Sequence, residues 1–125
     1  MSVKVDLDQL ADALADFTFA YLITVGDDYQ AHTIAVDPLL VGDALDVASV
    51  GNRTRRNVTA HPDVTVVWPP REPGGHTLIV DGRGELTEDG LTVTPATAVL
   101  HRKATPHSPA SVTGCGDDCL PLDGR

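Results

Sequence analysis

Three arginines close together are the residues of this sequence best suited to bind a ligand. Arg53, Arg55 and Arg56 lie between Gly51 and Pro62, in a segment without acidic residues, although the 125-residue chain has a net charge of −9. The glycine and the proline predict a turn followed by a short helix that ends before the proline. The N-terminus of a helix attracts anions through its free N–H groups and its dipole, and guanidinium groups add bidentate hydrogen bonds. The segment therefore predicts a site for a small phosphate. A solvated basic helix end is the alternative interpretation.

Helical spacing distributes these side chains over different faces of the predicted helix. Arg53, Arg56 and Asn57 share one face, whereas Arg55 points about 100° away from Arg56. We therefore expect Arg53 and Arg56 to contact the phosphate. Arg55 is expected to take no part.

The overall composition limits the possible partners. The sequence pI is near 4.7, and an acidic chain repels polyanions, so we expect no nucleic-acid partner. No apolar run approaches the roughly 18 residues that a membrane-spanning helix needs, and the first residues lack the apolar region of a signal peptide. We expect a cytoplasmic protein with no membrane partner.

The pattern of apolar residues and turn signals predicts a mainly β protein. Six strands joined mostly by short turns favour an antiparallel barrel, with bends at Asp37-Pro38 and at Gly82. Residues 1–102 form one domain in this interpretation, and residues 103–125, rich in proline and glycine, form an irregular tail that carries Cys115 and Cys119. The expected elements are a helix over 6–16, strands over 18–25, 29–36, 44–50, 64–68, 76–86 and 91–101, and the basic helix over 53–60.

The order of these elements and the basic segment resemble the pyridoxamine 5'-phosphate oxidase-like flavin-binding split barrels. Residues 51–58 read Gly-Asn-Arg-Thr-Arg-Arg-Asn-Val and are followed by His61-Pro62 and a valine-rich strand, which is similar to the family's Ser-Arg-Lys-x-Arg-Asn-Leu segment. The resemblance implies a six-stranded antiparallel split β-barrel with an N-terminal helix and a short helix after the third strand. It also implies a homodimer with FMN at the interface.

The same resemblance assigns roles to individual residues. Arg53 and Arg56 would hold the flavin phosphate, Thr54 stands where a lysine is common, and Asn57 matches the family's asparagine, whose amide can equally fasten the helix to the barrel. Trp68 is expected either to wall the cofactor pocket or to lie at the edge of the core. The remaining positions would lie beside the isoalloxazine ring: Ser49, Val50 and Gly51 on one side, Thr33 and Ala35 on the other.

The expected activity is an FMN-dependent oxidoreductase that passes hydride or electrons to or from a small organic substrate. The Arg-x-His segment with which pyridoxamine phosphate oxidases grip their substrate is not found in this sequence, so a different substrate is expected. A deazaflavin-dependent reductase and a non-catalytic dimer that binds a flavin or another phosphate ligand are the alternatives. The sequence identifies no catalytic residue and predicts no metal site.

Overall fold

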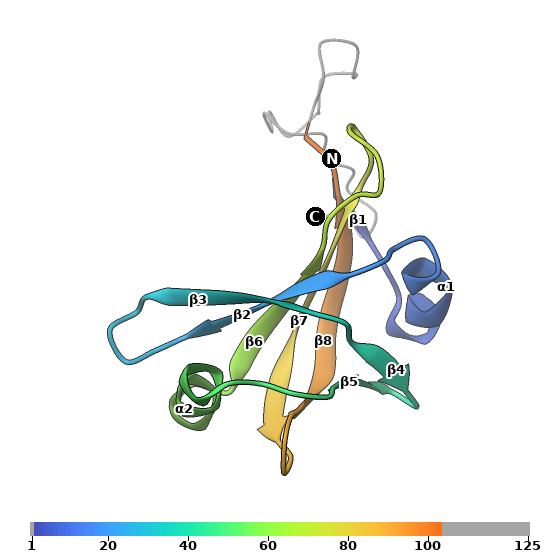
Figure 1. The fold of residues 1–125 in the computed structure, drawn as a ribbon. Helices are drawn as coiled ribbons and strands as arrows, with labels where there is room; N and C mark the ends of the chain where they lie inside the picture. The colour runs from blue at the N-terminus through green and yellow to red at the C-terminus, as the bar shows by residue number, and fades with distance from the viewer. Residues whose placement is uncertain (1, 104–125) are drawn as a thin grey trace.

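Residues 2–103 are described by a computed structural model, in which one antiparallel sheet curls into a half-barrel with short helices on its outside (Figure 1). The elements, in chain order, are β1 (Ser2–Lys4), the 3₁₀ helix η1 (Leu7–Gln9), α1 (Leu10–Leu14), β2 (Ala20–Val25), β3 (Ala31–Val36), β4 (Leu39–Val41), β5 (Ala44–Val47), α2 (Asn52–Ala60), β6 (Asp63–Trp68), β7 (Thr77–Leu86) and β8 (Leu91–His101).

The sheet has the strand order β3-β2-β6-β7-β8-β5-β4, and β1 adds to β8. All pairs are antiparallel. The two ends of this path, β3 and β4, are consecutive in the chain and are separated only by Asp37-Pro38, so the bend predicted there lets the sheet curl round on itself. The split β-barrel expected from the sequence is confirmed. The sheet has two more strands than predicted, because β1 and β4 are each three residues long and too short for a pattern of alternation to reveal.

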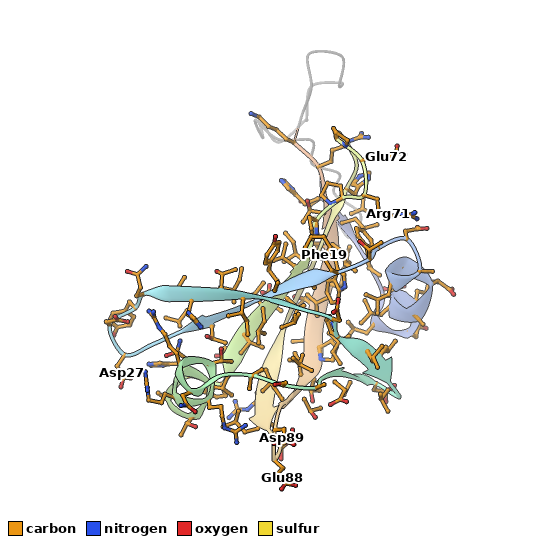
Figure 2. All side chains as sticks on the ribbon, viewed as in Figure 1. Phe19, Asp27, Arg71, Glu72, Glu88 and Asp89 are labelled. Atoms are coloured by element: carbon orange, nitrogen blue, oxygen red, sulfur yellow. The ribbon has the colours of Figure 1, made fainter. Side chains whose placement is uncertain are left out.

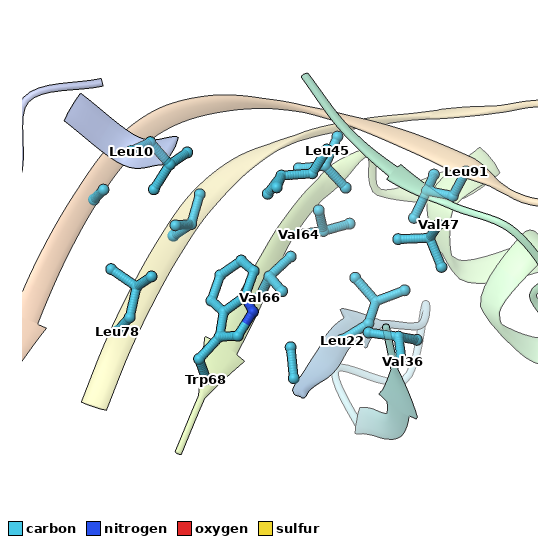
Figure 3. Close-up of a cluster of buried hydrophobic side chains, with 14 of the residues drawn as sticks. Leu10, Leu22, Val36, Leu45, Val47, Val64, Val66, Trp68, Leu78 and Leu91 are labelled. Atoms are coloured by element: carbon cyan, nitrogen blue, oxygen red, sulfur yellow. The ribbon is translucent and has the colours of Figure 1, made fainter. Parts of the chain in front are cut away.

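The core lies inside the curled sheet and consists of aliphatic side chains around one tryptophan (Figure 3). Alternate residues of β2, β5, β6, β7 and β8 point inward, as expected for strands that are buried on one face. Removing these side chains from water is the main driving force for closing the barrel. The fully enclosed residues of this cluster are Ala20, Leu22, Leu45, Val66, Leu78, Val80, Leu91 and Val93.

The β7–β8 hairpin contains the bend that its glycines predicted. Its register shifts between Asp81 and Gly82, as in a β-bulge. A Cβ atom on Gly82 would lie 2.5 Å from the Thr94 carbonyl oxygen, so the close approach of the two strands requires glycine. The hairpin thereby curves across the barrel, from the β6–β7 loop at one end to the β7–β8 turn at the other.

Two local predictions were wrong. The N-terminal helix is split into η1 and α1 instead of running over 6–16, and Leu7 remains 43% exposed. Only Leu10 of this segment is buried, so too little apolar surface packs on the barrel to hold a longer helix. The third strand ends at Val47 rather than at residue 50.

None of the helices among residues 2–103 is long and apolar enough to cross a membrane. The predicted tail beyond residue 103, with Cys115 and Cys119, lies outside the described residues.

Candidate functional site

Helix α2 begins at an open N-terminus. Gly51 is the N-cap in an extended conformation and accepts the first intrahelical hydrogen bond, from the Arg55 N–H to its carbonyl oxygen at 3.1 Å. Gly51 has no side chain to cap the helix, and the first turn contains no acidic residue. The N–H groups of Asn52, Arg53 and Thr54 precede this bond and have no intrahelical partner. They are therefore free to bind an anion.

The inner face of α2 fastens the helix to the barrel. Thr54 and Val58 are buried, and Asn57 is 7% exposed. The Asn57 amide donates a hydrogen bond from Nδ2 to the hydroxyl oxygen of Thr24 on β2 at 3.1 Å. A Cβ atom on Gly26 would lie 2.9 Å from Asn57 Oδ1, so glycine lets the turn after β2 approach the helix without displacing the Asn57 side chain. Of the two roles open to Asn57 in the sequence, the structure shows the fastening one.

The outer face of α2 presents Arg53 and Arg56, both exposed. Together with the turn between β2 and β3, these arginines line a cavity of about 470 Å³. Neither guanidinium has a hydrogen bond or ion pair to another of residues 2–103. The prediction that the two arginines share a face is confirmed, and both are available to a ligand.

The β2–β3 turn also brings carboxylates to this cavity. Asp27 and Asp28 line it together with the arginines, and Figure 2 shows Asp27 at the β2–β3 turn near α2. Asp27 Oδ1 lies 2.9 Å from Nε2 of His61 at the C-terminal end of α2, and Asp28 Oδ1 accepts a hydrogen bond from the Gln30 N–H at 3.0 Å. Both acids are therefore engaged in holding the turn. Their charges nevertheless weaken the attraction of the cavity for an anion.

This set of donors fits a phosphate monoester. Two guanidinium groups without partners among residues 2–103 and an uncapped helix N-terminus supply charge-assisted and backbone hydrogen bonds to phosphate oxygens. The same groups suit the phosphate of a flavin mononucleotide. A purely apolar ligand would leave them unused.

Arg55 has a partner that the sequence did not reveal. Its side chain is half-buried, and Nη2 donates a hydrogen bond to the carbonyl oxygen of Thr87, in the turn between β7 and β8, at 3.1 Å. Nη1 is buried without a partner among the described residues. Arg55 does not line the cavity of Arg53 and Arg56, as predicted, although it shares a separate hollow with Arg56, Thr59 and Leu86.

The segment before α2 is also accessible. Ser49 and Gly51 are exposed, and Val50 is half-buried. On β3, Thr33 and Ala35 are exposed on the outer face. The cavity of the arginines includes the turn of the β2–β3 hairpin rather than these two residues.

Trp68 lies in the core and is 3% exposed. It ends β6, whereas α2 precedes the start of that strand. Trp68 was expected either at the wall of the cofactor pocket or at the edge of the core. Its side chain lies among the core residues of Figure 3.

A second cavity, of about 450 Å³, lies at the other end of the barrel beside His76 and the β6–β7 loop. Its polar lining comes from Asp16, Arg71, Glu72 and His76. His76 Nε2 is buried and has no hydrogen-bond partner within the described range 2–103. An atom that water cannot reach is also closed to a ligand in an open cavity. Burial and the charge of Arg102 lower the pKa of His76. This cluster is therefore less suited to ligand binding than the cavity at α2.

Two mycobacterial proteins are similar to the chain over nearly its whole length. They are the uncharacterized proteins Mb0449c of Mycobacterium bovis and MT0457 of Mycobacterium tuberculosis, and each is 44% identical to this chain over 94% of both sequences. No protein-family model matches the sequence.

Three solved structures with the same fold have names that state an activity or a bound cofactor. A pyridoxamine 5'-phosphate oxidase-like protein of Listeria innocua has a TM-score of 0.62 and 18% identity, over 75% of this chain and 96% of its own. An FAD-binding protein of Mycobacterium smegmatis has a TM-score of 0.58 and 14% identity, over 82% of this chain and 100% of its own. An F420 reductase has a TM-score of 0.56 and 22% identity, over 70% of this chain and 94% of its own. The chain thus belongs to one family with the two mycobacterial proteins, and its fold is the split β-barrel of the pyridoxamine 5'-phosphate oxidase-like proteins.

Proposed function

We propose that this protein is a flavin-dependent oxidoreductase that binds FMN at the N-terminus of α2. The observation that carries the proposal is the pair of exposed arginines, which have no partner in the described part of the chain, beside an uncapped helix N-terminus. The fold is shared with a protein named as FAD-binding, which supports a flavin as the bearer of the phosphate. The bound flavin supplies the redox chemistry, and the substrate is a small organic molecule.

In this proposal, residues on the two faces of α2 have different roles. Arg53 and Arg56 bind the phosphate directly, and Thr54 and Asn57 hold the helix against the barrel so that its N–H groups face the ligand. Backbone of the 49–51 segment lies beside the ring system, and exposed Thr33 and Ala35 offer a second wall for the ring. None of these residues is assigned an acid–base role.

We also infer that the protein is a homodimer. Phe19 and Tyr21 are 39% and 38% exposed, and their rings stack edge to face with centroids 5.5 Å apart. Tyr21 pairs with Ala35 on β3 and with Val67 on β6, so apolar side chains continue across the outer face of the sheet. Covering such a patch with a second copy removes apolar surface from water. Thr33 and Ala35 lie on this same face, which supports a flavin site completed by the partner.

The test is a ligand titration of the purified protein. An absorption spectrum first shows whether flavin is already bound, and the stripped protein is then titrated with FMN, riboflavin and FAD. The proposal expects FMN to bind at least about tenfold more tightly than riboflavin, because only FMN supplies charge-assisted contacts to the arginines. Equal affinity for the two would refute a phosphate site. Bound FMN that no reductant or substrate turns over would point to the non-catalytic dimer.

A deazaflavin is the second candidate cofactor, because the F420 reductase shares the fold at 22% identity. Titration of the stripped protein with the deazaflavin, beside FMN, separates the two. Tighter binding of the deazaflavin would replace FMN in the proposal.

A further inference from the structure

The turn between β7 and β8, residues Thr87–Gly90, contacts α2 and the segment that leads into it. The Val50 N–H donates a hydrogen bond to the Asp89 carbonyl oxygen at 3.1 Å. Arg55, in the first turn of α2, donates from Nη2 to the Thr87 carbonyl oxygen at 3.1 Å. One contact lies just before the open helix N-terminus and the other just after it. The β7–β8 turn therefore holds this N-terminus from both sides.

The β7–β8 turn is itself closed by reciprocal hydrogen bonds. The Thr87 N–H donates to the Gly90 carbonyl oxygen at 3.0 Å, and the Gly90 N–H donates to the Thr87 hydroxyl oxygen at 3.0 Å. Such a turn presents its outward carbonyl oxygens in fixed positions. These are the carbonyl oxygens of Thr87 and Asp89 that the α2 region uses.

Gly90 packs directly on the end of β5. A Cβ atom at this position would overlap the Val47 carbonyl oxygen and lie 2.8 Å from the carbonyl carbon and oxygen of Ala48. Any larger residue must push the backbone of Val47 and Ala48 away from the turn. Since α2 begins four residues after Ala48, such a shift passes directly to the helix N-terminus.

Arg55 contributes the second contact from a half-buried position. Its guanidinium is not free to reach the cavity of Arg53 and Arg56 while Nη2 bonds to Thr87 and Nη1 is enclosed. Arg55 therefore does not contact a ligand in that cavity, but its hydrogen bond to Thr87 helps to place α2.

We propose that the β7–β8 turn positions the phosphate site, with Gly90 and Arg55 as its positioning residues. The inference rests on the proposed function, because it assigns a role toward the phosphate that Arg53 and Arg56 are proposed to bind. It adds to the site a turn that lies more than thirty residues away in the sequence.

Gly90→Ala tests the proposal without changing any charge, and Gly82→Ala is its matched control. Gly82 lies on the same hairpin, and a Cβ there also meets a backbone carbonyl oxygen, that of Thr94, but it does not touch the 47–51 segment. We expect Gly90→Ala to lower the ratio of FMN to riboflavin affinity about tenfold, and Gly82→Ala to leave this ratio unchanged even if it destabilises the fold. An unchanged ratio in a folded Gly90→Ala protein, or an equal change in both variants, would overturn the inference.

Amide hydrogen exchange provides a readout that needs no ligand. In the ligand-free protein, we expect the Val50 and Arg55 amides to exchange faster in Gly90→Ala than in Gly82→Ala, because only the first change disturbs the segment before α2. Unchanged protection of both amides would refute the positioning role even if the protein bound no flavin. An FMN preference lost in Arg53→Ala but kept in Gly90→Ala would reject this inference and leave the proposed function standing.

Arg55→Met and Arg55→Lys cover the case in which Gly90→Ala does not fold. Methionine keeps the length of the side chain without a donor, whereas lysine keeps both a donor and the charge. We expect methionine to lower the FMN-to-riboflavin ratio and lysine to restore most of it. No loss in the methionine variant, or an equal loss in both, would overturn the assignment of Arg55.

Discussion

Removing the side chain of Arg53 or Arg56 should weaken FMN binding and leave riboflavin binding unchanged. Both side chains are exposed at the α2 cavity and have no partner among the described residues. A hydrogen bond to a charged group contributes about 1.5–3 kcal/mol. Because the cavity is open to water, the lower end of this range applies, which corresponds to a loss of about tenfold in FMN affinity for each single substitution.

Folding stability should change far less than ligand affinity. An exposed arginine without a partner contributes within about 0.5 kcal/mol to the free energy of unfolding. The assay is therefore a fluorescence titration of Arg53→Ala and Arg56→Ala with FMN and with riboflavin, beside a thermal unfolding curve of each variant. A loss of both ligands together with a large fall in unfolding temperature would indicate damage to the fold.

The structure changes the choice of control for this experiment. Arg55 seemed from helical geometry to be a neutral neighbour, but it is bonded to Thr87 and its replacement would disturb the helix. Arg71, exposed in the β6–β7 loop at the other end of the barrel (Figure 2), gives the same change in net charge away from α2. If Arg71→Ala weakens FMN binding as much as Arg53→Ala and Arg56→Ala do, the effect is one of overall charge, and the phosphate site as proposed is wrong.

Three further outcomes follow from the same structure. Asp28→Asn should tighten FMN binding by about two- to fivefold in low salt, because it removes a carboxylate charge beside the arginines but keeps the Oδ1 acceptor for the Gln30 N–H. FMN is titrated at two salt concentrations, and an affinity equal to that of the parent protein at both would contradict this prediction. Tyr21→Asp should convert a homodimer into a 13.2 kDa monomer in sedimentation equilibrium, and a parent protein that is already monomeric would refute the inferred interface. Burial and the charge of Arg102 lower the pKa of His76 below its usual 6.5. The unfolded chain therefore binds this proton more readily, and the free energy of unfolding should fall as the pH drops through 6.5. His76→Gln should reduce the change in unfolding temperature between about pH 7.5 and about pH 5.5, and an identical change in the variant would contradict the lowered pKa of His76.

Local signals in the sequence predicted the parts of the site that depend on neighbouring residues. Gly51 and Pro62 delimit α2, because glycine at the N-cap leaves the first N–H groups without a side-chain acceptor and proline cannot continue a helix. The 3.6-residue period then places Arg53 and Arg56 together. The bend at Gly82 was equally predictable, since glycine within a strand commonly marks a bulge. The N-terminal helix was predicted too long, because its apolar spacing does not reveal that Leu7 finds no surface to cover.

The remaining features of the site depend on contacts between distant residues, which no local pattern encodes. His61 meets Asp27 across 34 positions, and Arg55 meets Thr87 across 32. Gly90 reads as an ordinary turn glycine until β5 is seen to pack against it.

The difference between Arg55 and its neighbours shows why the fold is needed to interpret the cluster. All three arginines have the same chemistry, and their spacing in the sequence gives only their directions around the helix. The fold decides what each direction meets: the β2–β3 turn and an open cavity for Arg53 and Arg56, and the carbonyl oxygen of Thr87 for Arg55. A half-buried guanidinium that donates to a backbone carbonyl oxygen is held in place by the protein, whereas an exposed one can exchange water for a ligand at low cost. Burial therefore separates the arginine that holds the helix in place from the two that remain available to bind phosphate.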